Sequence, residues 1–272
     1  MVEILKAILF GIVQGITEWL PISSTGHMIL LEKFVSMDVS ENFWNLFLVV
    51  IQLGSILAVV VLYWNKIFPF HFKKKEVIDK DIFSMWFKII VGSIPVGIVG
   101  VFFDDQLNEM FYNYKTVAIM LILVGVLFIV VETWNKNRKP KVNSIADITY
   151  SAAFWIGVFQ MMAAAFPGTS RSGATIVGAL MIGISRTTAA EFTFFMAIPA
   201  MLGGSLLKLR KFGFSFTSQE LTILLVGTLV AFLVSIVVIK FLMAFIKKHD
   251  FKPFAWYRIA LGIIVLAYFM NI

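Results

Sequence analysis

Long apolar stretches alternate with short polar segments along this chain. Residues 43–64 and 221–239 contain no charged side chain, and a helix of about 20 largely apolar residues can cross the hydrocarbon core of a bilayer. Four further stretches are apolar apart from one isolated charge each. They cover residues 82–103, 116–134, 187–207 and 254–272 and carry Lys88, Glu132, Glu191 and Arg258, respectively. The pattern therefore predicts an all-α protein with six membrane-spanning helices.

Two further segments, residues 4–33 and 149–185, are interrupted by helix-breaking residues. Each begins with an apolar helical pattern of about a dozen residues, which is too short to cross the bilayer. Each then reaches Pro21 or Pro167, followed by small hydroxyl residues and glycine. Irregular backbone at membrane depth is tolerated only where it is buried in protein or lines a wet cavity. We therefore expect two broken-helix, re-entrant hairpins.

The two broken segments are similar to each other. Residues 11–26 can be laid over residues 157–172 without a gap. The aligned pairs are Gly11 with Gly157, Gln14 with Gln160, Pro21 with Pro167, Ser23 with Thr169 and Ser24 with Ser170. This predicts an internal duplication with halves of approximately 1–134 and 147–272, within a single domain over 1–272.

The aligned halves differ at their reactive positions. Glu18 lies opposite Ala164, His27 opposite Gly173, and Arg171 opposite Thr25. The first half would therefore supply acid or base groups and the second half an anion clamp. We expect the two breaks to form one composite site.

Lysine and arginine gather in the polar loops near residues 65–81, 135–148 and 240–253. If the hairpins do not span, these loops lie on one side of the membrane, and their charge makes that side cytoplasmic. Both termini are then outside, and the hairpins enter from opposite sides as an inverted-topology repeat. Lys208, Arg210 and Lys211 fall on the outer side, against this rule.

Composition also indicates a membrane protein. The 272 residues are 60% hydrophobic and 14% charged, and the mean hydropathy is +0.90, which excludes a water-soluble domain. Cysteine is absent, so disulfides, thiolate metal sites and a cysteine nucleophile are excluded. The formal net charge of +7 lies in short loops, so we interpret it as contact with lipid headgroups and not with nucleic acid. The N-terminal stretch has no cleavage site, and we do not expect a removable signal peptide.

The first break places Glu18 inside a membrane hairpin, on the same helix face as Gln14. An ionisable group at that depth is a functional candidate, although a glutamate that reaches the interface is the alternative. Ser23, Ser24, Thr25, Gly26 and His27 follow at the start of a new helix, where backbone N–H groups attract anions. The alternatives are ordinary N-capping by the hydroxyls and a structural hydrogen bond from the histidine.

The second break carries Thr169, Ser170, Arg171 and Ser172. A guanidinium at membrane depth needs an anionic partner, and its planar fork matches phosphate oxygens. Phosphate recognition is therefore one interpretation of Arg171. A structural ion pair with Glu18 or Glu191 is the other.

These two motifs resemble those of the undecaprenyl-pyrophosphate phosphatases of the bacitracin-resistance family. The resemblance is carried by residues 14–27 (Gln-Gly-Ile-Thr-Glu-Trp-Leu-Pro-Ile-Ser-Ser-Thr-Gly-His) and 167–175 (Pro-Gly-Thr-Ser-Arg-Ser-Gly-Ala-Thr). It extends over nearly the whole chain and includes Gln52-Leu53-Gly54-Ser55 and Glu191-Phe192. It implies removal of the terminal phosphate from the undecaprenyl lipid carrier at the outer face of the bacterial plasma membrane. Recycling of that carrier for peptidoglycan synthesis and resistance to bacitracin would follow.

The resemblance also assigns residues. The acidic motif of the family falls on Gln14 and Glu18, the serine-histidine motif on Ser24 and His27, and the arginine motif on Arg171. Many members have glutamate where this chain has Gln14, so a scheme that needs two carboxylates there does not transfer directly.

The expected reaction is metal-assisted hydrolysis of a pyrophosphate. Glu18 would hold a divalent cation (Mg²⁺, with Ca²⁺ as the alternative) or a water, His27 would move a proton, and Arg171 would clamp phosphate. Ser24 would be either nucleophile or phosphate ligand. The remaining phosphate contacts are expected from hydroxyl and glycine positions of the two breaks, namely Ser23, Thr25, Gly26, Thr169, Ser170 and Ser172, with Gln14 in support.

Two other classes of function remain open from the residues alone. Inverted repeats with broken helices are also a transporter architecture, so a lipid-carrier flippase or another secondary transporter is the principal alternative. A structural scaffold is the third, but it leaves Glu18, His27 and Arg171 unexplained. The expected partners are a polyprenyl pyrophosphate and membrane lipids, and self-association into a homo-oligomer is left open.

Overall fold

The structure is a computed structural model that describes residues 1–70, 78–213 and 215–270. The basic run Lys73–Lys75 and the last two residues of the predicted final span lie outside these ranges. Within them the regular structure is helical, apart from two isolated β-bridges. The all-α prediction is confirmed.

Six helices in the described ranges are long and apolar enough to cross a membrane, as the hydrophobic pattern predicts. They are α3 (Glu41–Leu62), α5 (Lys80–Phe102), α7 (Tyr114–Asn135), α10 (Arg186–Phe212), α11 (Ser218–Ile246) and α12 (Lys252–Met270). Polar caps set several of their starts, because a side-chain oxygen satisfies an N–H group that has no partner within the helix. Ser40 accepts from Phe43 N before α3, and Asn113 accepts from Thr116 N before α7.

The other helices are shorter. They are α1 (Val2–Thr17), α2 (Ser24–Phe34), α4 (Trp64–Ile67), α6 (Asp104–Phe111), α8 (Tyr150–Ala165) and α9 (Arg171–Ile182). The chain leaves helical conformation between α1 and α2 and again between α8 and α9, at the segments that contain Pro21 and Pro167. The two predicted helix breaks are confirmed.

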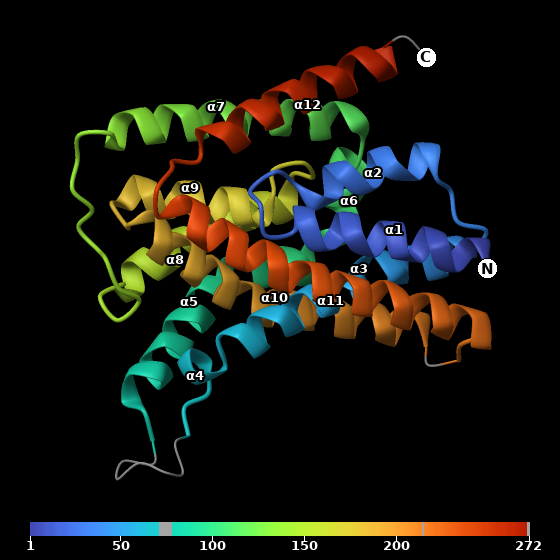
Figure 1. Cartoon of the computed structure of the whole chain (residues 1–272), viewed down its shortest axis with the longest axis horizontal. Coiled ribbons are helices and arrows are strands. Elements are labelled where there is room, and N and C mark those ends of the chain that lie inside the picture. The colour runs from blue at the N-terminus through green and yellow to red at the C-terminus, as the bar shows by residue number, and fades with distance from the viewer. Residues whose placement is uncertain (71–77, 214, 271–272) are drawn as a thin grey trace.

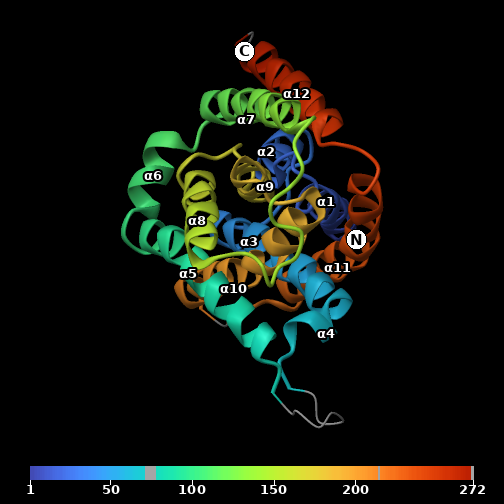
Figure 2. The ribbon, with the colours of Figure 1, turned by 90° about the vertical axis from the view of Figure 1, so that its left-hand side faces the viewer.

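Helix α9 lies near the middle of the molecule, and the other helices surround it (Figure 2). Around it α1 packs along α11, α8 along α5, and α7 along α12 (Figure 1). The α5 and α8 backbones touch, since a Cβ added at Gly157 would lie 2.0 Å from the Gly92 carbonyl oxygen. Such close contact through small residues is how helices associate in lipid, where the solvent is as apolar as the side chains.

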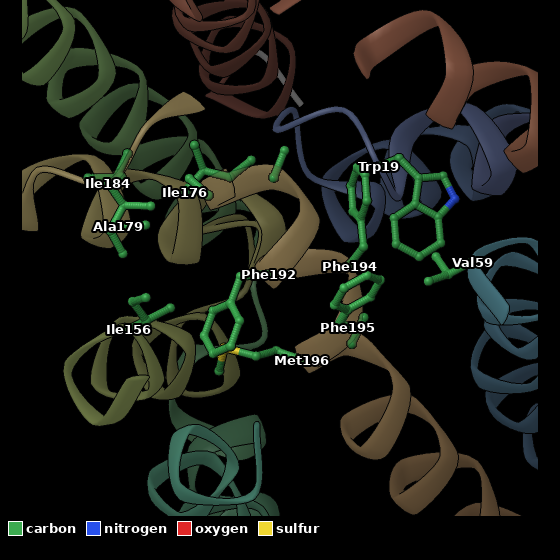
Figure 3. Packing of buried hydrophobic residues seen from close by; sticks show 14 of the residues in the cluster. Trp19, Val59, Ile156, Ile176, Ala179, Ile184, Phe192, Phe194, Phe195 and Met196 are labelled. Carbon is green, nitrogen blue, oxygen red and sulfur yellow. The ribbon is translucent and has the colours of Figure 1, made fainter. Parts of the chain in front are cut away.

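An aromatic cluster anchors the first break. Trp19, between α1 and α2, is fully buried, and its ring lies edge-on to Phe194 of α10 with centroids 5.1 Å apart. Figure 3 shows this pair beside Phe192, Phe195 and the side chains of α8 and α9. The irregular segment that carries Glu18 is therefore held against α10 by the buried Trp19.

Candidate active site

Both breaks end in the same strained serine. Among the described residues, the non-glycine residues with positive φ are Ser23 (74°) and Ser170 (69°). Each caps the next helix: Ser23 Oγ accepts from Gly26 N at 3.2 Å, and Ser170 Oγ accepts from Gly173 N at 3.1 Å. A non-glycine residue in such a conformation costs on the order of 1–3 kcal/mol and persists where surrounding structure enforces it, often at a functional site.

The two caps correct the gapless alignment. Structurally equivalent positions are Ser23 with Ser170 and Gly26 with Gly173, one residue away from the pairing of Ser23 with Thr169. In the corrected register Arg171 lies opposite Ser24, not Thr25. The gapless register is wrong beyond the prolines because the caps, and not the prolines, define where α2 and α9 begin.

Glu18 is the centre of the first break. Its side chain is 5% exposed, and its two carboxylate oxygens accept from three side chains. Gln14 Nε2 donates to Oε2 at 2.7 Å, Ser24 Oγ donates to Oε2 at 2.9 Å, and Arg171 Nη2 donates to Oε1 at 2.8 Å. The carboxylate is buried and paired inside the protein, which contradicts the alternative of a glutamate that extends to the membrane surface.

Arg171 begins α9 and joins the second break to the first. Its Nη1 donates to Thr193 O at 3.3 Å, and its side chain is 15% exposed. Of the two structural partners considered for it, Glu18 is bound, whereas Glu191 pairs with Lys66 Nζ at 2.8 Å. Arg171 is therefore paired with Glu18 in the structure.

His27 points away from Ser24. Its Nδ1 lies 2.7 Å from Ser23 O and its Nε2 lies 2.7 Å from the Tyr257 hydroxyl. A carbonyl oxygen only accepts, so Nδ1 carries the proton and Nε2 accepts from Tyr257. The base in contact with Ser24 is thus a carboxylate and not the imidazole.

Two of the predicted phosphate ligands instead make hydrogen bonds within the protein, and one of them joins the two breaks. Ser172 Oγ donates to Glu18 O at 3.2 Å and lies 3.2 Å from Ser170 Oγ, and Thr169 Oγ1 donates to Phe166 O at 2.6 Å. The hydroxyls of Thr169 and Ser172 are therefore occupied within the protein.

A cavity of about 510 Å³ opens beside the first break, and we call it the Ser24 cavity. Of the predicted site residues, Gln14, Ser24 and Thr25 line it, whereas Glu18, His27 and Arg171 do not. The rest of its lining is Met28, Asn45, Leu48, Val49, Gln52, Tyr112 and Lys208. Glu18 is reached from this cavity through its hydrogen bonds to Gln14 and Ser24.

Arg258 of α12 is a residue whose role sequence reasoning missed. It is fully buried, and its guanidinium donates to the carbonyls of both breaks: Nη1 to Pro21 O at 3.1 Å, and Nη2 to Gly168 O at 3.0 Å and Thr169 O at 2.9 Å. It also donates to Leu121 O and Met120 O of α7. The available signal was the lone arginine in an apolar stretch, because such a charge must find partners inside the protein.

The donor set near Ser24 fits a divalent cation that also contacts substrate. The described residues contain no cluster of three or more His, Cys, Asp or Glu side chains suited to a metal. Mg²⁺, however, is commonly held by only one or two carboxylates together with substrate phosphates. Glu18 supplies one such carboxylate, and the Ser24 hydroxyl oxygen lies beside it.

Comparison with known proteins identifies the family. Residues 7–264 match the family model described as bacitracin resistance protein BacA. The chain belongs to the BacA family. It is 62% identical to an undecaprenyl-diphosphatase of Desulfitobacterium hafniense, over 99% of this chain and 97% of the relative. A relative of the same name from Enterococcus faecalis is 61% identical over 97% and 96%, and one from Acetivibrio thermocellus is 58% identical over the full length of both. Membership of the BacA family confirms the expectation from the two motifs.

Proposed function

We propose that this chain is an undecaprenyl-diphosphatase that removes the terminal phosphate of undecaprenyl diphosphate. The observation that carries the proposal is the junction of the two breaks, where Glu18, Ser24 and Arg171 meet beside the Ser24 cavity. A carboxylate, a hydroxyl and a guanidinium are the groups that pyrophosphate cleavage needs. Full-length similarity to proteins of that name supports the same substrate. Recycling of the lipid carrier for the cell wall and bacitracin resistance would follow from this activity.

Binding would begin with an exchange of partners. The pyrophosphate carries negative charge into the cavity, and its oxygens compete with Glu18 for Arg171. Glu18 Oε1, released by Arg171, would hold a divalent cation, Mg²⁺ or alternatively Ca²⁺, which when bound neutralises charge on the phosphate oxygens, while Oε2 would stay beside Ser24. The starts of α2 and α9 would add backbone N–H donors at Thr25 and Ser172, since the Gly26 and Gly173 N–H groups already donate to the capping serines.

We assign the role of nucleophile, one of the two roles predicted for it, to Ser24. Its Oγ donates to the buried Glu18 carboxylate at 2.9 Å and lines the cavity, the arrangement of a hydroxyl beside its base. Attack of Oγ on the terminal phosphorus would pass its proton to Glu18 and release the lipid phosphate as leaving group. Water would then hydrolyse the phosphoserine. His27, held between Ser23 O and Tyr257, would orient the turn that presents Ser24.

The Ser24→Ala variant tests this role. We expect turnover to fall by more than about 10²-fold, because the attacking oxygen is lost. Phosphate release at saturating substrate measures it. A residual rate within about tenfold, or roughly 1.4 kcal/mol in barrier, would make Ser24 a phosphate ligand instead.

Lys208 is expected to bind the substrate. It was one of three cations on the outer side against the charge rule, and it is the cation in the lining of the Ser24 cavity. The described residues offer it no ion-pair partner. A charge-assisted hydrogen bond contributes about 1.5–3 kcal/mol, so Lys208→Met should raise KM about tenfold or more with a smaller change in kcat. Arg210→Met is the control, since Arg210 is exposed and does not line the cavity. An equal rise in KM in both variants would mean that Lys208 acts only through the overall positive charge near the site and does not contact the substrate.

The proposed activity is separated from lipid transport by a simple assay. Purified protein in detergent, where no second compartment exists, should release inorganic phosphate from polyprenyl diphosphate. EDTA should suppress the release and Mg²⁺ should restore it. Absence of phosphate release from folded protein in Mg²⁺ would favour a flippase. Full turnover in excess EDTA would exclude a role for the metal in the reaction.

We also propose that α1–α2 and α8–α9 are re-entrant hairpins of an inverted repeat, with the site open to the extracytoplasmic side. The support is that α8 and α9 are apolar but short, and that both breaks carry the same serine cap. Single cysteines at Lys6 and Lys33 should then be labelled from the same side of intact cells by a membrane-impermeant reagent. Labelling from opposite sides would make the first segment a span and remove the inverted repeat.

A further inference from the structure

A second cavity, of about 440 Å³, lies at the opposite end of α9 from Arg171. Helix α9 has 12 residues, so its two ends are about 18 Å apart. The ends of α7, α9 and α11 and the start of α10 line this cavity, together with the loop after α7, which Figure 1 places at the left. We call it the basic cavity, because its lining includes Lys136, Arg138, Lys139, Lys141, Arg186 and Lys247.

The charge of the basic cavity is not balanced by protein. Glu132 is the carboxylate in its lining, and Arg186 uses it: Arg186 Nε lies 2.9 Å from Oε1 and 3.1 Å from Oε2. Glu132 Oε1 also accepts from Phe251 N at 3.0 Å. In the part of the chain that the structure describes, the other five cations have no ion-pair partner. Five like charges around one cavity repel each other, and a bound anion would offset that repulsion.

The cavity is held in shape by hydrogen bonds. Lys141 N donates to Gly183 O at 2.8 Å, and Ser185 N donates to Val142 O at 2.9 Å, so the loop after α7 pairs with the α9–α10 connection. Asn135 Nδ2 donates to Leu180 O at 3.0 Å. The Arg138 guanidinium lies 3.9 Å from the centroid of the Trp134 ring. These contacts fix the backbone from which Arg138, Lys139 and Lys141 extend, and the side chains themselves are exposed.

Apart from the polar Asn135, Ser185 and Thr187, the uncharged part of the lining is apolar or glycine, and it indicates the kind of anion. Leu180, Ile184 and Ile246 are buried side chains in the wall. The cavity also adjoins the ends of α7 and α11, two of the helices suited to cross a membrane. The cations can bind the phosphate of a lipid headgroup, and the apolar wall at the end of a membrane-spanning helix can contact the acyl chains joined to it. We propose that the basic cavity binds the headgroup of an anionic phospholipid from the surrounding leaflet.

Binding can be measured on the purified full-length protein in an uncharged detergent. Phosphatidylglycerol should raise Tm and remain bound in native mass spectra, whereas phosphatidylcholine and inorganic phosphate at the same concentration should not. Lys139→Gln/Lys141→Gln should weaken the apparent affinity for phosphatidylglycerol about tenfold or more, if each lost charge-assisted contact contributes about 1.5–3 kcal/mol. Lys240→Gln/Lys248→Gln is the matched control, because both lysines are exposed and lie outside the cavity lining.

Three outcomes would overturn the proposal. Equal affinity in the cavity variant and the wild type would show that the lipid binds elsewhere. Equal binding of phosphatidylcholine would remove the requirement for an anion, and equal binding of inorganic phosphate would make the ligand a soluble phosphate. If the variant does not fold, a photoactivatable phosphatidylglycerol on the wild type decides: crosslinks should fall within residues 134–141 or 180–187, and crosslinks only outside them contradict the assignment.

Discussion

Replacing Arg171 with lysine is expected to lower turnover by about 10²-fold or more, although the charge is kept. Arg171 uses two nitrogens at once, Nη2 toward Glu18 and Nη1 toward Thr193 O. A lysine can keep one of these contacts, but its compact ammonium cannot grip two phosphate oxygens in one plane. The loss should be greatest when charge moves onto the leaving phosphate, so kcat should fall together with substrate affinity.

Turnover, KM and Tm of Arg171→Lys give the answer when they are measured together. Lysine can still pair with Glu18, so Tm should stay close to that of the wild type. Arg210→Lys is the control for the substitution itself, because Arg210 is exposed on α10. Near-normal turnover in folded Arg171→Lys would mean that Arg171 is a structural partner of Glu18 and nothing more.

Glu18→Gln is expected to lower turnover by about 10²-fold or more, and Gln14→Glu by far less. The amide in Glu18→Gln keeps the shape of the side chain. It removes the negative charge of the carboxylate that accepts hydrogen bonds from Arg171 and Ser24. Gln14 Nε2, in contrast, only donates to Glu18 at 2.7 Å. In Gln14→Glu two carboxylates would face each other at the position of that hydrogen bond and would repel each other. A divalent cation between them would relieve the repulsion.

The two variants also differ in their response to metal. Gln14→Glu should remain active in Mg²⁺ and lose more activity than the wild type in EDTA, whereas Glu18→Gln should stay impaired at any Mg²⁺ concentration. Titration of phosphate release against Mg²⁺ measures both. A wild-type rate for Glu18→Gln would falsify the assignment of the catalytic carboxylate to this position.

The sequence by itself determined the parts of this protein that depend on local pattern. Six apolar stretches became six long helices, because hydropathy and length suffice to select a spanning helix. Pro21 and Pro167, each followed by small hydroxyl residues and glycine, marked the two breaks, whereas Pro95 and Pro199 lie inside α5 and α10, so proline alone does not end a helix. The two motifs around these prolines indicated the family, and ionisable side chains at membrane depth singled out Glu18 and Arg171.

Only the tertiary structure decided how these parts meet. The contact between Arg171 and Glu18 joins residues 153 positions apart, and which of two carboxylates the arginine binds depends on helix packing and not on pattern. The positive φ of Ser23 and Ser170 cannot be read from the sequence. The caps at these serines also show that the second break has one residue more than the first between its proline and its capping serine, which the gapless alignment missed. His27 had to be placed in space before Tyr257 could be recognised as its partner. Arg258 stabilises both breaks by donating to backbone carbonyls. Because every residue has a backbone carbonyl, the pattern of side chains in the sequence cannot show which carbonyls an arginine will bind.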